Sequence, residues 1–299
     1  MAVQTLDSAT ITAQERYTTS SVTSKDGTTI GYRQLGRGPG LILLHGSMES
    51  AQSHMQLAEA LADSFTVYLP DRRGRGLSGP YSKDHSIRKD VEDMDALLTK
   101  TGAHTVFGVS SGALIWLQAA LTLPAIHKAA LFEPALVVND SISTNFIMRL
   151  DRELGDGKID AAMVTAMLGA QMGPPIFQRF PRWLLKKLTN MMMVSEDKNA
   201  KSGDITMRML APTVRYDFLI VDEMKAALES FESIRADVLL LGGSKSPAYL
   251  RTALGALEKI LPHAKRVEFA GLDHSATGNR DQRGAPEQVA QVMCQFLSR

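Results

Sequence analysis

Short apolar runs recur along most of this chain and predict the strands of a buried sheet. Residues 28–35 alternate between apolar and polar positions, as expected of an edge strand. Leu41–Leu44 is a continuous apolar run, which is typical of a strand covered on both faces. The other predicted buried strands are Phe65–Leu69, Thr105–Val109, Ala129–Phe132, Val238–Leu241 and Arg266–Phe269.

Longer segments with apolar residues at helical spacing lie between most of these runs. They are Ser50–Ala62, Ser86–Thr101, Gly112–Leu123, Pro247–Leu261 and Pro286–Leu297. A helix between two strands allows the strands to run parallel, because it returns the chain to the starting end of the sheet. The sequence therefore predicts an α/β protein with a mainly parallel sheet and helices on both faces.

The alternation stops between residues 135 and 233. No convincing strand occurs over these roughly 100 residues, which is far too long for an ordinary crossover. The interval is helical in period and holds ten of the fifteen methionines. We expect a helical cap here, in which methionines either fill the core or form a pliable pocket wall. The expected organisation is a flexible leader at 1–17, a core at 18–134 and 234–299, and a cap at 135–233.

Composition narrows the function classes. The 299 residues carry 33 Lys and Arg against 32 Asp and Glu, and this balance gives no footprint for nucleic-acid binding. No apolar stretch approaches the roughly 18 residues of a membrane span, and the start of the chain lacks the apolar segment of a secretion signal. The one cysteine, Cys294, can form neither an internal disulfide nor a cysteine-based metal site. We expect a cytoplasmic protein with no nucleic-acid or membrane partner.

One segment carries a motif of nucleophilic catalysis. Gly108-Val109-Ser110-Ser111-Gly112 fits the pattern G-x-S-x-G and lies between a predicted strand and a predicted helix. In that context the serine occupies a strained turn, and the glycines avoid collisions with neighbouring backbone. The amide of Ser111, at the start of the helix, would face a developing oxyanion. The alternative is a glycine-rich helix start in which Ser110 is only a cap.

From residue 18 onward the sequence resembles the α/β-hydrolase family. Leu43-Leu44-His45-Gly46-Ser47 is similar to the family's His-Gly turn after the third strand, whose amides bind the oxyanion. The resemblance implies an eight-stranded sheet with a helical cap between the sixth and seventh strands. It also implies that Gly46 or Ser47 acts with Ser111 as the oxyanion hole. His274 lies between the last strand and the last helix, where the family places its catalytic histidine.

The acid that would orient His274 departs from the majority pattern of the family. Most members carry an aspartate in the turn after the strand that follows the cap, and this position here holds Ser246. A minority, which includes resorcylic-acid lactone hydrolases, carries the acid one strand earlier. In this chain that strand is followed by Glu133, which is therefore our candidate. Asp140, Asp217 and Asp222 are the fallback acids.

The resemblance implies a serine hydrolase of the esterase or lactonase type. Ser110 would attack the carbonyl of an apolar ester or lactone, and His274 and Glu133 would act as base and orienting acid. No metal or cofactor is implied. Trp183 and Met192 are our candidates for substrate contact in the cap. The same fold and triad also serve cofactor-free C–C bond hydrolases, and some relatives are small-molecule receptors. The oligomeric state stays open, with a homodimer among the alternatives.

Overall fold

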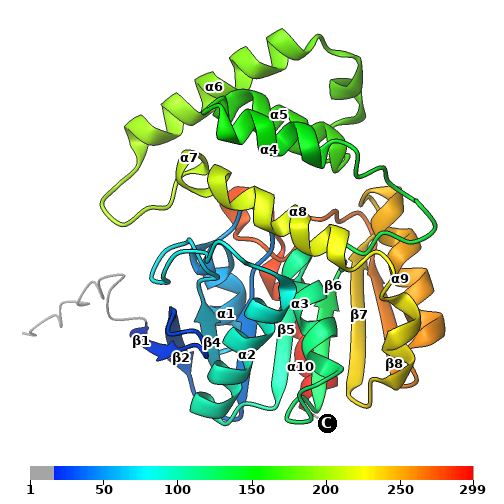
Figure 1. The fold of residues 1–299 in the computed structure, drawn as a ribbon. Helices are drawn as coiled ribbons and strands as arrows, with labels where there is room; N and C mark the ends of the chain where they lie inside the picture. Colours follow the sequence, from blue (N-terminus) through cyan, green and yellow to red (C-terminus); the bar gives the residue numbers. More distant parts are fainter. Residues whose placement is uncertain (1–16, 299) are drawn as a thin grey trace, which may run out of the picture.

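A single eight-stranded sheet forms the centre of the molecule, in a computed structural model that describes residues 17–298 (Figure 1). Its order is β1-β2-β4-β3-β5-β6-β7-β8. Strand β2 runs antiparallel to both its neighbours, and the pairs from β4 to β8 are parallel. The strands are β1 Thr18–Thr23, β2 Thr29–Gly36, β3 Gly40–Leu44, β4 Thr66–Pro70, β5 Thr105–Val109, β6 Lys128–Phe132, β7 Asp237–Gly243 and β8 Ala264–Phe269. The predicted fold class is confirmed.

Helices cover both faces of this sheet. Successive side chains of a strand point to opposite faces. On β3, Leu41 and Leu43 pack in the cluster with α1 and α10, whereas Ile42 and Leu44 pack in the cluster with α2, α3 and α9. Burial on both faces explains why the sequence of β3 is a continuous apolar run. The helices of the two layers are α1 Met55–Leu61, α2 Ile87–Thr101, α3 Ser111–Ala120, α9 Ala248–Ile260 and α10 Pro286–Leu297.

Five helices lie in the chain between β6 and β7. In Figure 1, α4, α5 and α6 form a layer beyond the carboxyl ends of the strands, with α8 between this layer and the sheet. Their bounds are α4 Ile147–Gly155, α5 Ile159–Gly169, α6 Arg182–Asn199, α7 Met207–Leu210 and α8 Val214–Glu223. Short 3₁₀ helices are η2 Ala51–His54, η3 Pro175–Arg179, η4 Ala211–Thr213, η5 Leu228–Ser233 and η6 Arg280–Gln282. The cap boundaries at 135 and 233 remain a prediction.

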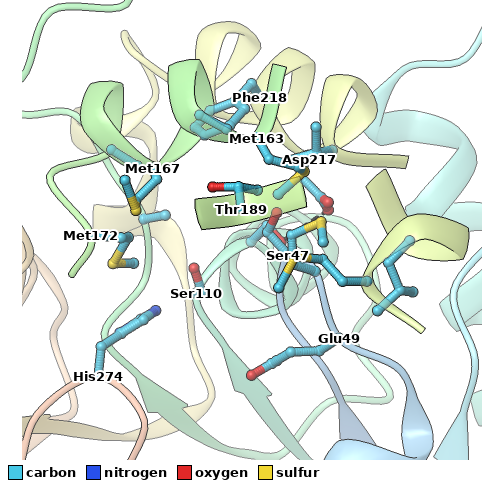
Figure 2. Close-up of a pocket in the computed structure, with 18 of the residues that line it drawn as sticks. Ser47, Glu49, Ser110, Met163, Met167, Met172, Thr189, Asp217, Phe218 and His274 are labelled. Carbon is cyan, nitrogen blue, oxygen red and sulfur yellow. Dashed lines mark hydrogen bonds between the residues drawn. The ribbon is translucent and has the colours of Figure 1, made fainter. Parts of the chain in front are cut away.

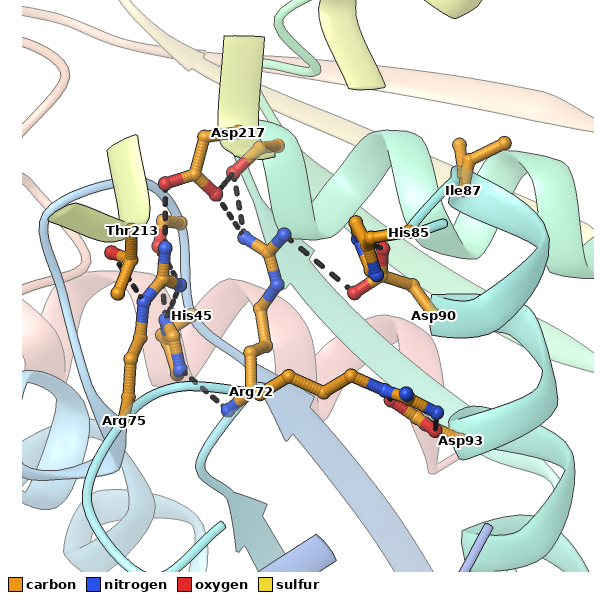
Figure 3. A network of polar contacts seen from close by, with 12 residues as sticks. His45, Arg72, Arg75, His85, Ile87, Asp90, Asp93, Thr213 and Asp217 are labelled. Carbon is orange, nitrogen blue, oxygen red and sulfur yellow. Dashed lines mark hydrogen bonds and ion pairs between the residues drawn. The ribbon is translucent and has the colours of Figure 1, made fainter. Parts of the chain in front are cut away.

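A buried ionic cluster joins α8 to the core (Figure 3). Asp217 on α8 accepts hydrogen bonds from Arg72 Nη1 at 2.6 Å and from Arg75 Nη2 at 2.5 Å. Arg72 and Arg75 lie in the loop after β4, and all three side chains are almost fully buried. Thr213 Oγ1 accepts a further hydrogen bond from Arg75 Nε at 3.0 Å. The last cap helix is therefore fixed over the carboxyl ends of the strands.

The sequence predicts a flexible leader at the start of the chain and no membrane-spanning segment. The predicted leader at 1–17 lies, apart from residue 17, outside the described residues. Over the described range, no helix combines the length and apolarity needed to cross a membrane.

Candidate active site

Ser110 occupies a sharp turn between β5 and α3. Its backbone has φ 55° and ψ −120°, a conformation that residues with a side chain rarely adopt. The Ser110 amide donates to Phe132 O at 3.0 Å, and this bond ties the turn to the end of β6. The side chain is 8% exposed and lines a cavity. The predicted strand, turn and helix around this serine are all present.

The glycines on either side of Ser110 permit this turn. A Cβ on Gly108 would lie 2.6 Å from Trp116 Cδ1 and 2.8 Å from Gly112 O. A Cβ on Gly112 would lie 2.5 Å from the backbone oxygen of His45. Cβ atoms essentially never make contacts this short, so any side chain here would push α3 away from β3 and β5. The spacing of the motif is thus a packing requirement.

Glu133 and His274 meet behind the cavity. Nδ1 of His274 and Oε2 of Glu133 are 2.6 Å apart, and the other oxygen of Glu133 accepts the Gly243 amide at 2.6 Å. Glu133 directly follows β6, is fully buried, and has φ 45°. Because Nδ1 faces a carboxylate, it carries a proton. Of the candidate acids, the structure brings Glu133 to the imidazole, whereas Asp217 bonds Arg72 and Arg75.

The surroundings of His274 favour its charged form. Burial disfavours an imidazolium, but the hydrogen bond and charge of Glu133 outweigh this cost, with help from Glu49 and Asp273. Together these groups raise the pKa of His274 above its ordinary value. An imidazole of raised pKa is a better proton acceptor, as a general base for a serine must be.

Ser110 and His274 line one cavity of about 860 Å³ beneath the cap. Figure 2 shows the imidazole directed toward the Ser110 hydroxyl. Among the described residues, the hydroxyl makes no hydrogen bond to the ring. Catalytic hydrogen bonds of this kind are often long without substrate and shorten when substrate binds. The arrangement can present an activated hydroxyl to a carbonyl group held in the cavity.

The predicted oxyanion donors are not equivalent. The Gly46 amide donates to Oε2 of Glu49 at 2.7 Å, which argues against Gly46 as a donor to an oxyanion. Ser47 and Ser111 both line the cavity. The Ser111 amide is the first of α3, and the N–H groups of a first helical turn have no partner within the helix. Ser47 and Ser111 are therefore the remaining pair.

Methionines from the cap form much of the cavity wall. Six cap methionines line the cavity: Met163, Met167, Met172, Met191, Met192 and Met207. Two others, Met193 and Met224, are buried, and Met148 and Met209 are exposed, so the pocket-wall and core-filler uses both occur. Trp183 is 68% exposed and lies outside the cavity lining that the described residues form. It is nine residues, about two and a half helical turns, from Met192, and so faces the opposite side of α6.

One acidic residue near Ser110, Glu49, was not predicted as part of the site. It lines the cavity, as does Asp217, which the sequence offered only as a fallback acid. A carboxylate four residues after His45 was a signal available in the sequence, but the partners of Glu49 come from distant loops. Over residues 17–298, no group of three or more His, Cys, Asp or Glu side chains could hold a metal ion.

The sequence model of the Alpha/beta hydrolase family matches residues 41–292. Among solved structures, an alpha/beta hydrolase from Sphaerobacter thermophilus DSM 20745 is similar with a TM-score of 0.75 and 30% sequence identity. That similarity covers 93% of this chain and all of the other.

Two curated relatives are similar over part of their length. The uncharacterized hydrolase YraK of Bacillus subtilis is 33% identical over 117 residues, which are 37% of this chain and 43% of that protein. A pimeloyl-[acyl-carrier protein] methyl ester esterase of Stenotrophomonas maltophilia is 34% identical over 97 residues, which are 32% of this chain and 36% of that protein. Each match thus spans less than half of the relative. The chain belongs to the alpha/beta hydrolase family, and the names of its relatives support hydrolase activity.

Proposed function

We propose that this protein is a serine hydrolase that cleaves a carboxylic ester or lactone of an apolar small molecule. The observation that carries the proposal is the 2.6 Å contact between Glu133 and His274, with His274 directed toward a strained Ser110 in one cavity. The mainly apolar lining favours an apolar substrate. The esterase among its relatives supports the choice of an ester bond.

The proposed reaction has two stages. In the first, His274 takes the proton of Ser110 while the oxygen of Ser110 attacks the substrate carbonyl. The amides of Ser47 and Ser111 bind the oxyanion, and Glu133 stabilises the imidazolium. The C–O bond to the alcohol then breaks, and His274 returns the proton to the departing alkoxide.

The second stage releases the acyl group. Water gives a proton to His274, its oxygen attacks the acyl carbon, and the bond to Ser110 breaks. The serine oxygen regains its proton from His274, and a carboxylic acid leaves. With a lactone, the acid and the alcohol are parts of one product.

The proposal predicts turnover of a short p-nitrophenyl ester that depends on Ser110. Ser110→Ala should reduce kcat by at least about 10³-fold, because it removes the hydroxyl toward which His274 is directed. Ser195→Ala is the matched control, since Ser195 is an exposed serine on the cap side of the same cavity. The measurement is release of p-nitrophenolate, with circular dichroism to show that both variants fold.

Other outcomes favour the alternatives. Thermal stabilisation by ligands with no turnover of any ester or lactone would favour a receptor. Hydrolysis of diketones without hydrolysis of esters would favour C–C bond cleavage. Turnover that survives in Ser110→Ala would contradict the acyl-enzyme.

A further inference from the structure

Glu49 forms a second carboxylate–imidazole pair beside the nucleophile. Oε2 of Glu49 lies 3.0 Å from Nε2 of His54, and Nδ1 of that ring lies 2.9 Å from the backbone oxygen of Thr277. A carbonyl oxygen only accepts hydrogen bonds, so Nδ1 carries a proton. A second proton must lie between Nε2 and the carboxylate.

The charges of this pair are settled by its surroundings. Burial opposes ionisation of both groups, but their mutual attraction lowers the pKa of Glu49 and raises the pKa of His54. The Gly46 amide adds a hydrogen bond to the carboxylate. Both shifts favour a carboxylate beside an imidazolium.

The negative end of the pair faces the cavity. His54 is fully buried, whereas the side chain of Glu49 is 29% exposed and lines the cavity. Both known hydrogen bonds of Glu49 end on Oε2. Oε1 has no partner among the described residues. A charged acceptor with free lone pairs thus opens into a cavity that is otherwise mainly apolar.

Glu49 is also close to the reacting atoms. A Cβ built on Gly46 would lie 3.1 Å from Oε2 of Glu49 and 3.1 Å from Cβ of Ser110, so one glycine separates the two side chains. In Figure 2, Glu49 and His274 lie on either side of Ser110. Asp217, a buried carboxylate of the same cavity, differs from Glu49 because each of its oxygens already accepts a hydrogen bond from an arginine.

We propose that the free oxygen of Glu49 recognises a hydrogen-bond donor of the substrate, a hydroxyl group, near the scissile carbonyl. The same carboxylate repels a substrate that carries an anionic group at that position. His54 holds the carboxylate in place from behind and balances its charge. This inference rests on the proposed function, because it assigns a substrate class to the same cavity. It makes Glu49 a specificity-determining residue with no proton transfer of its own.

The test is a binding comparison in Ser110→Ala, which removes cleavage from the measurement. The ligands are methyl 3-phenylpropionate and its derivatives with one hydroxyl or one carboxylate at carbon 2, at carbon 3 or at the ortho position of the ring, which are the positions nearest the ester carbonyl. Titration calorimetry should give a Kd about tenfold lower for the best hydroxylated ligand than for the parent, because a hydrogen bond to a charged acceptor is a strong one. Every carboxylated ligand should bind about tenfold more weakly than the parent or worse.

The variants identify Glu49 as the cause. In Ser110→Ala/Glu49→Gln the hydroxyl preference should fall below about threefold, and the penalty for the carboxylate should disappear. Ser110→Ala/Glu196→Gln removes a carboxylate from the exposed rim of the same cavity and should leave both ratios unchanged. A purely structural role of Glu49 would weaken all ligands by one factor and leave the ratios intact.

Two results would overturn the inference: equal Kd values for the parent and every hydroxylated ligand in Ser110→Ala, or unchanged ratios in the Glu49 variant. The first comparison needs no change at Glu49, so it holds even if that variant fails to fold. Failure of the proposed function is seen separately, as absence of ester turnover by the wild type. Binding ratios that are all close to one in an active esterase would refute the inference alone.

Discussion

Backbone strain occurs at Ser110 and Glu133 of the candidate site, as it does at Met48 of the cavity lining. Ser110 and Glu133 have φ values of 55° and 45° and follow the paired residues Val109 and Phe132 of adjacent strands. Both side chains therefore leave the sheet at the same level. Such conformations cost about 1–3 kcal/mol each, and the surrounding hydrogen bonds and packing must supply that energy. Strain at these positions aims the two side chains and is consistent with a functional role.

Glu133→Gln tests the acid. A glutamine keeps the size of the side chain but cannot stabilise an imidazolium, so kcat for a p-nitrophenyl ester should fall by about 10³–10⁴-fold. Asp140→Asn and Asp222→Asn are controls, because Asp222 is exposed and the structure places neither residue at the imidazole. Full activity of Glu133→Gln, with a large loss in either control, would move the assignment to another acid.

The pH dependence of kcat/KM follows from the raised pKa of His274. The imidazole must be neutral to accept the proton of Ser110, so activity is lost as pH falls through this pKa. Because Glu133 raises the pKa, the acid limb should lie above the ordinary histidine value of about 6.5. Glu133→Gln removes the stabilising charge and should move the limb to lower pH. A limb in the variant at the same or higher pH would contradict this account.

At the scale of elements, close contact between α3 and the sheet sets the position of the nucleophile. Gly112 lies in the first turn of α3 and touches the backbone of β3 and the loop that follows it. The turn at Ser110 is thus determined by close packing between β3, β5 and α3. The polar edge strand β1 (Thr18–Thr23), in contrast, makes little contact with the core. Only Val22 of β1 is buried, so the sequence carries no apolar run there and we predicted no strand.

Two glycine-to-alanine substitutions on helices should have opposite effects on stability. Gly112→Ala should lower the free energy of unfolding by about 1–3 kcal/mol, since its methyl group meets immobile backbone. Gly255→Ala, within α9, should raise it by about 0.5–1 kcal/mol, because the nearest side-chain atom that its Cβ would meet, Arg266 Nη1, is 3.7 Å away. Urea denaturation of both variants measures the difference. Equal stability of the two variants would contradict the packing argument.

At the scale of the whole molecule, cap and core meet through charge as well as apolar packing. Asp217 on α8 joins Arg72 and Arg75 of the core, and the Ser111 hydroxyl accepts a hydrogen bond from Arg72 at 2.9 Å. Ser111, the residue after Ser110, thus belongs to the same network that holds α8. This arrangement connects α8 to the start of α3, directly beside Ser110.

Removal of the shared carboxylate should therefore destabilise the protein strongly. Asp217→Asn leaves the buried guanidinium of Arg75 without its counter-charge and leaves Arg72 with Asp90 at 3.8 Å, which should cost about 3–5 kcal/mol of unfolding free energy. Asp222→Asn, on the exposed side of the same helix, should change it by less than about 0.5 kcal/mol. Denaturant unfolding of both variants checks the prediction. An unchanged free energy of unfolding in Asp217→Asn would show that the cluster does not hold the cap.

Several features could be predicted from the sequence because local physical rules determine them. Burial on both faces produces the apolar runs of the inner strands, and the elbow around Ser110 requires small residues at 108 and 112. The absence of an acid at Ser246 pointed to Glu133, and the structure brings Glu133 to His274. These features depend on patterns within a few residues, or on the order of elements that the family resemblance supplies.

Only the tertiary structure decided which distant groups touch. The sequence does not distinguish Glu49 from an ordinary loop carboxylate. In the structure Glu49 contacts His54 and Gly46, and the contact with Gly46 argues against Gly46 as an oxyanion donor. Trp183 and Met192 share one helix, an apolar character and a high exposure, yet only Met192 belongs to the cavity lining that the described residues form. Sequence determines local conformation and burial, whereas partners across the fold depend on where each loop and helix face comes to rest.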